Sequence, residues 1–296
     1  MIDTRRPLDA TAVSVMVLLT GLWGFQQVAI KLTAPDISLV MQAAIRSGIA
    51  TMLVLVWAWA RNIALFSRDG TFWPGLVAGL LFGGEFIFIY SGLAHTAASR
   101  MVVFIYLCPP LTALGLHFLV PGERMTLLQW FGVMLSFCGL VLAFGEGFVS
   151  AQGATALGDA FGFIAAALWA ATTVLIRATG LARITPSKTL FYQLSVSAVM
   201  LLATSLLLGE RGVIALTPLA LLSLAYQGVI VAFASYLAWF WLLTRYLAGR
   251  LAVFSFLAPL FGVAFGVMIL GEPMTPWFAA AALLVGAGIV LVNLRR

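Results

Sequence analysis

The sequence predicts an all-α integral membrane protein of ten transmembrane helices, arranged as two inverted five-helix repeats. An apolar composition, ten long apolar runs and an internal repeat indicate this fold class. Of the 296 residues, 63% are hydrophobic and 9% are charged, against about 25% charged residues in an average soluble domain. A soluble enzyme and a disordered chain are therefore excluded. With only 2 cysteines, a disulfide-stapled secreted module is excluded as well.

Ten apolar runs are long enough to cross a bilayer core, which needs about 20 mainly apolar helical residues. They cover residues 12–33, 38–60, 73–94, 98–119, 126–145, 158–179, 188–208, 217–243, 250–270 and 276–293. The longest connection, EGFVSAQGATAL at 146–157, divides the chain into halves at 1–148 and 149–296. The first run is longer than a signal-peptide core, so we expect it to be retained as the first helix.

The distribution of Lys and Arg predicts the orientation, because basic connections are held on the cytoplasmic side of a membrane. With the N-terminus inside, twelve basic residues fall on the cytoplasmic side and three, Lys31, Arg100 and Arg211, on the other. Both termini are therefore predicted to be cytoplasmic. The net charge is +6, but the basic residues never form a patch, so nucleic acid is not a predicted partner.

The second half of the chain repeats the first at an offset near 150 residues. SRMVVFIYLCPP at 99–110 matches GRLAVFSFLAPL at 249–260, and LWGFQQVAIK at 22–31 matches LWAATTVLIR at 168–177. Each copy holds five spans, so the second copy enters the membrane from the opposite side. Inverted repeats are typical of secondary transporters, whose substrate site lies near mid-membrane between the halves. The alternative is a duplication that only builds a membrane scaffold.

The LWG motif at 22–24, Arg46 in QAAIRSGIA and residues 90–144 resemble the EamA-type members of the drug/metabolite transporter superfamily. The second half resembles the same pattern through LAPL and GEPMT. Within the family, the chain is similar to the YddG-type exporters of aromatic and other neutral amino acids. The resemblance implies efflux across a bacterial inner membrane. It also implies a central cavity within helices 1–4 and 6–9. One departure is Val196, which stands near the place where Arg46 would repeat.

Two titratable side chains, Arg46 and Glu85, lie deep in the predicted spans. A charge at the bilayer centre costs about 2.5–3.5 kcal/mol on insertion scales, so it usually faces a partner or a wet cavity. We expect Glu85 to bind a substrate ammonium or take up a proton, the alternative being a protonated carboxyl bonded in the packing. Arg46 either holds a substrate carboxylate or bonds helix-end carbonyls.

Further polar and aromatic side chains are candidates for lining a substrate cavity. With Arg46 and Glu85, the substrate-binding candidates are Trp23, Gln26, Gln27, Tyr106, Trp169, Thr172, Thr173, Ser235 and Trp239. For the polar residues of helices 1 and 6, hydrogen bonding between packed helices is the alternative. Pro109 and Pro259 are the predicted hinges, because proline frees a carbonyl one turn earlier and kinks a helix.

Two other patterns are interpreted as structural. Gly75, Gly79 and Gly83 form a GxxxGxxxG stripe, which favours close helix packing. Glu123 and Glu272 occupy equivalent positions of the two repeats, at the turns into helices 5 and 10. A carboxylate at a helix start caps backbone amides and complements the helix dipole, so we expect both to act there.

The sequence contains no catalytic motif, metal-ligand spacing or nucleotide-binding loop, so no enzyme activity, cofactor or metal is predicted. We predict a monomeric carrier that exports small amphipathic metabolites by alternating access, with aromatic and neutral amino acids as the favoured substrates. The alternatives are a multidrug or other metabolite efflux carrier and a channel. Besides the small-molecule substrate, the predicted partner is the lipid bilayer.

Overall fold

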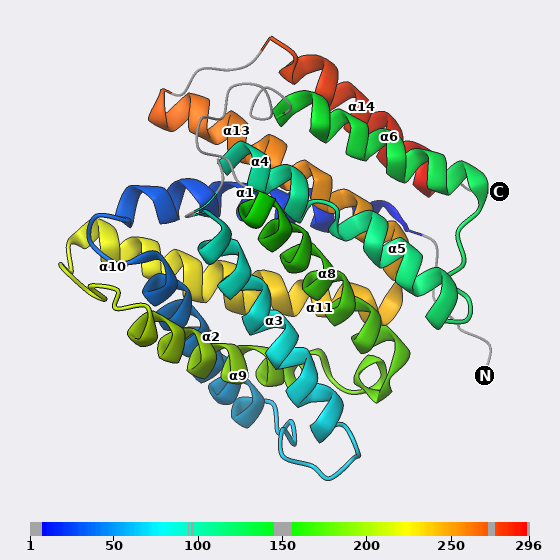
Figure 1. The fold of residues 1–296 in the computed structure, drawn as a ribbon. Helices are drawn as coiled ribbons and strands as arrows, with labels where there is room; N and C mark the ends of the chain where they lie inside the picture. The colour runs from blue at the N-terminus through cyan, green and yellow to red at the C-terminus, as the bar shows by residue number, and fades with distance from the viewer. Residues whose placement is uncertain (1–7, 94, 96–97, 145–155, 272–275, 295–296) are drawn as a thin grey trace.

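The computed structural model describes residues 8–93, 95, 98–144, 156–271 and 276–294, and these residues form a helical bundle (Figure 1). In this part of the chain the one β-type pairing is an isolated bridge between Ile37 and Val213. Eight of the described helices are long and apolar enough to cross a membrane, and two shorter apolar helices accompany them. The predicted all-α membrane fold with ten spans is therefore confirmed.

The first five spans are α1 (Ala10–Thr33), α2 (Leu39–Ala60), α3 (Phe72–Leu93), α4 (Ala98–Ile105) with α5 (Cys108–Leu119), and α6 (Leu127–Phe144). The sixth and seventh are α8 (Ala156–Ala178) and α9 (Pro186–Leu207), joined by the short helix η1 (Gly180–Arg183). The eighth is α10 (Pro218–Ala225), η2 (Tyr226–Ser235) and α11 (Tyr236–Arg245). The ninth consists of α12 (Ala248–Ala252), η3 (Val253–Phe256) and α13 (Leu257–Leu270), and the tenth is α14 (Phe278–Asn293). The predicted span ends lie within two residues of these bounds.

Three spans depart from regular α-helix along their length. Span 4 breaks between α4 and α5, and Pro109 lies in the first turn of α5, where the lack of an N–H costs no hydrogen bond. In span 9, a 3₁₀ segment (η3) precedes α13, whose third residue is Pro259. In span 8, the whole of η2 is a π-helix. Long π segments are rare and are frequently found at functional sites.

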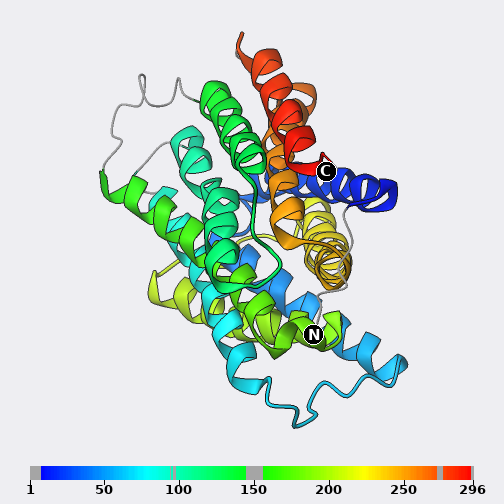
Figure 2. The same cartoon turned by 90° about the vertical axis from the view of Figure 1, so that its right-hand side faces the viewer.

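The contacts between spans keep the same pattern when the two halves are exchanged. Spans 5 and 10 pack on each other as α6 and α14, side by side at one edge of the molecule (Figures 1 and 2). Spans 2 and 7 likewise pack on each other as α2 and α9. The contact of span 1 with span 9 (α1 with α13) corresponds to the contact of span 6 with span 4 (α8 with α4 and α5). The contact of span 3 with span 7 (α3 with α9) corresponds to the contact of span 8 with span 2 (η2 with α2). Such an exchange is the arrangement that a duplicated five-helix unit would give.

The glycine stripe of α3 faces α9. A Cβ atom at Gly79 would lie 2.6 Å from Cβ of Val196, and one at Gly75 would overlap the ring of Tyr192. The interpretation of the stripe as a close helix–helix contact is confirmed.

We expect Gly288→Ala to separate α14 from α6, because a Cβ at Gly288 would overlap the backbone of Gly132 and the side chain of Ser136. Overpacking of this kind costs about 1–3 kcal/mol, so the thermal unfolding temperature in detergent should fall. Gly286→Ala is the matched control on the same helix, since a Cβ at Gly286 meets nothing within 4 Å. Equal unfolding temperatures for the two variants would contradict this account.

Candidate functional site

Arg46 on α2 and Glu85 on α3 are buried at the same depth in the bundle, with 1% and 6% of their surfaces exposed. Arg46 lies seven residues after the start of α2, and Glu85 lies eight residues before the end of α3. Adjacent spans run in opposite directions, so both positions are about 10–12 Å from the same end of the bundle. The two side chains are near enough to influence each other electrostatically, but within the described residues they form no direct ion pair.

Within the described residues, neither side chain has hydrogen-bond partners for all of its polar atoms. Nε and Nη2 of Arg46 and Oε2 of Glu85 are buried and have no hydrogen-bond partner among the described residues. Cζ of Arg46 stacks on the Phe86 ring, 4.3 Å from its centroid, which leaves the edge of the guanidinium free to donate. Unsatisfied buried polar atoms are costly, so an arrangement that keeps three of them beside two charges is suited to a ligand of complementary charges.

Aromatic rings from α1, α3 and α11 surround the two charges. The Phe82 ring meets Phe86 and Tyr236 edge-on, at centroid distances of 5.2 and 5.9 Å. Tyr236 interacts electrostatically with both Arg46 and Glu85. Its ring also lies 6.4 Å from that of Trp23, in an edge-to-face contact. The result is a polar centre with an aromatic wall.

The π-helix η2 ends at Ser235, which is where span 8 meets α1. Nε1 of Trp23 donates a hydrogen bond of 2.9 Å to Oγ of Ser235, and that hydroxyl donates to the carbonyl of Val231 at 2.6 Å. The Trp23 ring also lies 6.0 Å from that of Trp239. Trp23 therefore contacts both Ser235 and Trp239, which are two further predicted residues.

Tyr106 occupies the break in span 4 and lies close enough to Glu85 to interact with it electrostatically. Its ring lies 5.9 Å from that of Trp169 on α8 and 6.4 Å from that of Phe256 in η3. The interrupted parts of spans 4 and 9, which precede Pro109 and Pro259, thus meet through Tyr106 and Phe256.

The remaining predicted residues contribute less to this centre. The hydroxyls of Thr172 and Thr173 donate to carbonyls of their own helix, those of Leu168 and Trp169. Gln26 is buried on α1. The side chain of Gln27 lies outside the described residues.

Sequence reasoning missed a buried amide cluster one helical turn from Arg46. Oε1 of Gln42 accepts hydrogen bonds from Nε2 of Gln227 at 3.0 Å and from the hydroxyl of Thr33 at 3.2 Å. Nε2 of Gln227 also donates to Ser223 at 3.0 Å. The signal was available, because residues four apart share a helix face and Gln42 therefore lies beneath Arg46.

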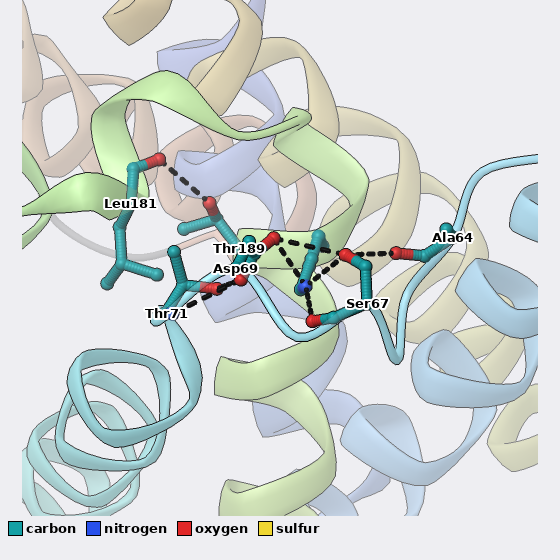
Figure 3. Close-up of polar contacts among 7 residues, drawn as sticks. Ala64, Ser67, Asp69, Thr71, Leu181 and Thr189 are labelled. Carbon is teal, nitrogen blue, oxygen red and sulfur yellow. Dashed lines mark hydrogen bonds and ion pairs between the residues drawn. The ribbon is translucent and has the colours of Figure 1, made fainter.

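At one end of the bundle the connection between α2 and α3 is tied to the start of α9 (Figure 3). Nζ of Lys188, which is 2% exposed, donates to the carboxylate of Asp69 at 2.7 Å and to the carbonyl and hydroxyl of Ser67 at 2.8 Å. Asp69 also accepts a hydrogen bond from the hydroxyl of Thr71. We call Ser67, Asp69 and Lys188 the α9 latch.

A second latch ties the start of α2 to the connection between α9 and α10. The carboxylate of Glu210 accepts hydrogen bonds from the backbone N–H groups of Val40 at 3.2 Å and Met41 at 3.1 Å, and from the hydroxyl of Ser205 at 2.6 Å. We call this contact the α2 latch. The α9 latch joins the first turn of span 7 to the connection after span 2. The α2 latch joins the first turn of span 2 to the connection after span 7.

The stability that the α9 latch contributes should not change with pH in the physiological range. The Lys188 ammonium, followed by the Thr71 hydroxyl, holds the pKa of Asp69 below its usual value of 3.8. A lowered carboxyl pKa stabilises the fold above the usual value, and this contribution is lost only as the pH falls through the folded pKa. We therefore expect Lys188→Met to lower the unfolding temperature by the same amount throughout about pH 5–8, with the difference shrinking below about pH 4. Arg68→Gln, an exposed neighbour, is the control. A difference that varies between pH 5 and 8 would contradict this assignment.

Glu123 forms a buried ion pair with Arg177, and both side chains are at most 1% exposed. The same carboxylate accepts hydrogen bonds from the N–H groups of Ala248 at 3.1 Å and Gly249 at 3.3 Å, at the start of α12. We expected Glu123 to cap the backbone amides at the start of helix 5, and this expectation was wrong. The carboxylate instead binds the buried Arg177 guanidinium and the free amides at the start of span 9. Glu272, its equivalent, lies outside the described residues.

The comparisons with known proteins agree with this arrangement of spans. The model of the EamA-like transporter family matches residues 10–145 and 156–294. The chain belongs to the EamA-like transporter family. Members of this family are multi-pass membrane transporters, which agrees with the apolar helices, and the resemblance to the EamA-type family is confirmed.

Relatives of this EamA-family chain cover most of its length. It is 28% identical to the uncharacterized transporter YvbV of Bacillus subtilis over 96% of this chain and 91% of that protein. It is 25% identical to a probable amino-acid metabolite efflux pump of Salmonella typhimurium over 70% of this chain and 72% of that protein. A solved crystal structure, 19% identical, superposes with a TM-score of 0.81 over 96% of this chain and 98% of that one, which shows a shared fold.

Proposed function

We propose that this EamA-family transporter exports aromatic and other neutral amino acids. The observation that carries the proposal is the buried Arg46–Glu85 pair, whose unsatisfied polar atoms share one depth inside an aromatic wall. An amino acid carries one positive and one negative group, so it can satisfy both side chains without bringing net charge into the bundle. The printed name of the Salmonella typhimurium relative supports the same substrate class.

In the proposed complex, the substrate ammonium binds the Glu85 carboxylate and the substrate carboxylate binds the edge of the Arg46 guanidinium. Both contacts are charge-assisted hydrogen bonds, which are shorter and stronger than neutral ones. The substrate side chain lies among Trp23, Tyr236 and Tyr106. Gln26, Gln27, Trp169, Thr172, Thr173, Ser235 and Trp239 complete the proposed lining.

Transport proceeds by alternating access between two inverted repeats, residues 1–148 and 149–296. The two latches are equivalent contacts, because exchange of the two halves would convert the α9 latch into the α2 latch. When the cavity opens at one face of the membrane, the latch at that face breaks, while the latch at the opposite face stays closed. Pro109 and Pro259 serve as hinges at the interrupted spans. The carrier acts as a monomer in a bacterial inner membrane, with both termini in the cytoplasm.

Flux measurements in proteoliposomes test the substrate class and the carrier mechanism. We expect saturable uptake of labelled Phe, Trp, Thr and Met, with mutual competition and little flux of a cationic drug. Flux of the drug alone would move the assignment to multidrug efflux, and amino-acid flux that rises linearly with concentration would indicate a channel. The absence of any flux would leave the scaffold alternative.

A further inference from the structure

A second site lies away from the Arg46–Glu85 centre, where α6, α12 and α14 meet. It is a pocket of about 290 Å³, near the lower end of the volumes typical of ligand pockets. The residues that line it include Arg124, Thr126 and Arg250 on the polar side, and Leu128, Leu291 and Leu294 on the apolar side. None of them belongs to the proposed substrate site.

The pocket has an excess of positive charge. Glu123 also lines it and is the acidic neighbour of Arg250, but its carboxylate is engaged by Arg177 and by the amides of Ala248 and Gly249. Nε of Arg250 is buried and has no hydrogen-bond partner among the described residues. Arg124 is exposed at the mouth. Two arginines are therefore available to one anionic group.

The form of the pocket matches the phosphate group of a lipid. Arginine presents a planar fork of donors that fits phosphate oxygens. The leucines of α6 and α14 form an apolar wall beside this charge, and these two helices lie at the edge of the bundle (Figure 1). Basic pockets between transmembrane helices on the cytoplasmic side bind anionic headgroups, and the arginine distribution assigns this end of the bundle to the cytoplasm.

We propose that this pocket binds the phosphate group of an anionic phospholipid of the cytoplasmic leaflet, through Arg124 and Arg250, with an acyl chain against Leu291 and Leu294. The bound lipid joins the outer pair α6 and α14 to the start of span 9. This proposal is independent of the transported substrate.

Lipid binding to the full-length chain in detergent tests the proposal, with native mass spectrometry as the readout. We expect palmitoyl-oleoyl phosphatidylglycerol to bind more tightly than phosphatidylcholine with the same chains. Arg124→Gln/Arg250→Gln should weaken phosphatidylglycerol binding about tenfold or more, because it removes two charge-assisted contacts. Arg183→Gln is the matched control, an exposed arginine outside the pocket, and should bind as the wild type does.

Two further arms make the outcomes decisive. Arg124→Gln alone changes an exposed side chain, so its fold is preserved, and it should weaken binding on its own. Displacement of the lipid by inorganic phosphate at equal concentration would retain the phosphate site but assign it to a soluble ligand. Equal phosphatidylglycerol affinity for the wild type and the double variant, or equal affinity for both lipids, would overturn the proposal.

Discussion

Glu85→Gln and Arg46→Gln are each expected to weaken amino-acid binding by about 10- to 100-fold, because each removes a charge-assisted hydrogen bond to the substrate. Each single variant also leaves the other buried side chain without its electrostatic partner, so it should lower the stability of the fold as well. Transport in proteoliposomes and unfolding in detergent measure the two effects separately. Arg61→Gln, an exposed arginine near the end of α2, is the control for the loss of a positive charge.

The double variant Arg46→Gln/Glu85→Gln separates a substrate site from a structural ion pair. We expect it to regain most of the stability lost in the single variants, since no uncompensated charge remains, while transport stays at the level of the weaker single variant. If transport recovered together with stability, the pair would be structural and the proposed substrate contacts would be wrong.

Glu123→Gln is expected to destabilise the fold by about 3–5 kcal/mol, because it leaves the Arg177 guanidinium buried without its counter-charge. The carboxylate also holds the first amides of α12, so the start of span 9 should loosen as well. Arg183→Gln is the control for the loss of a charge at an exposed position. Unfolding in detergent that differs by less than about 1 kcal/mol between Glu123→Gln and the control would contradict a structural role for the pair.

The positions of the ten spans could be predicted from the sequence, because hydrophobic length is the dominant constraint inside a bilayer. The breaks at spans 4 and 9 were also signalled, by Pro109 and Pro259. The π-helix of span 8 was not, since its sequence, YQGVIVAFAS, is apolar and has no proline. In the structure this segment packs against α1 and α2.

The burial of Arg46 and Glu85 was predictable, because a charge within an apolar run stands out. The surroundings of these charges were harder to derive. Phe86 was one aromatic residue among many, and only packing decides which rings face Arg46 and Glu85 rather than lipid. The repeat offset pointed to Val196 as the equivalent of Arg46, yet counting from the first residues of α2 and α9 points to Gln193, which is buried. Insertions shift a sequence offset without moving the helices.

The central claim is that Glu85 recognises the ammonium and Arg46 the carboxylate of the substrate. Its most direct test is the affinity of wild type, Glu85→Gln and Arg46→Gln for phenylalanine, 2-phenylethylamine and 3-phenylpropionate. The account predicts that the wild type favours phenylalanine. Glu85→Gln should no longer distinguish phenylalanine from 3-phenylpropionate, and Arg46→Gln should no longer distinguish it from 2-phenylethylamine. If both variants kept the preferences of the wild type, the two side chains would not contact the substrate, and the account would be contradicted.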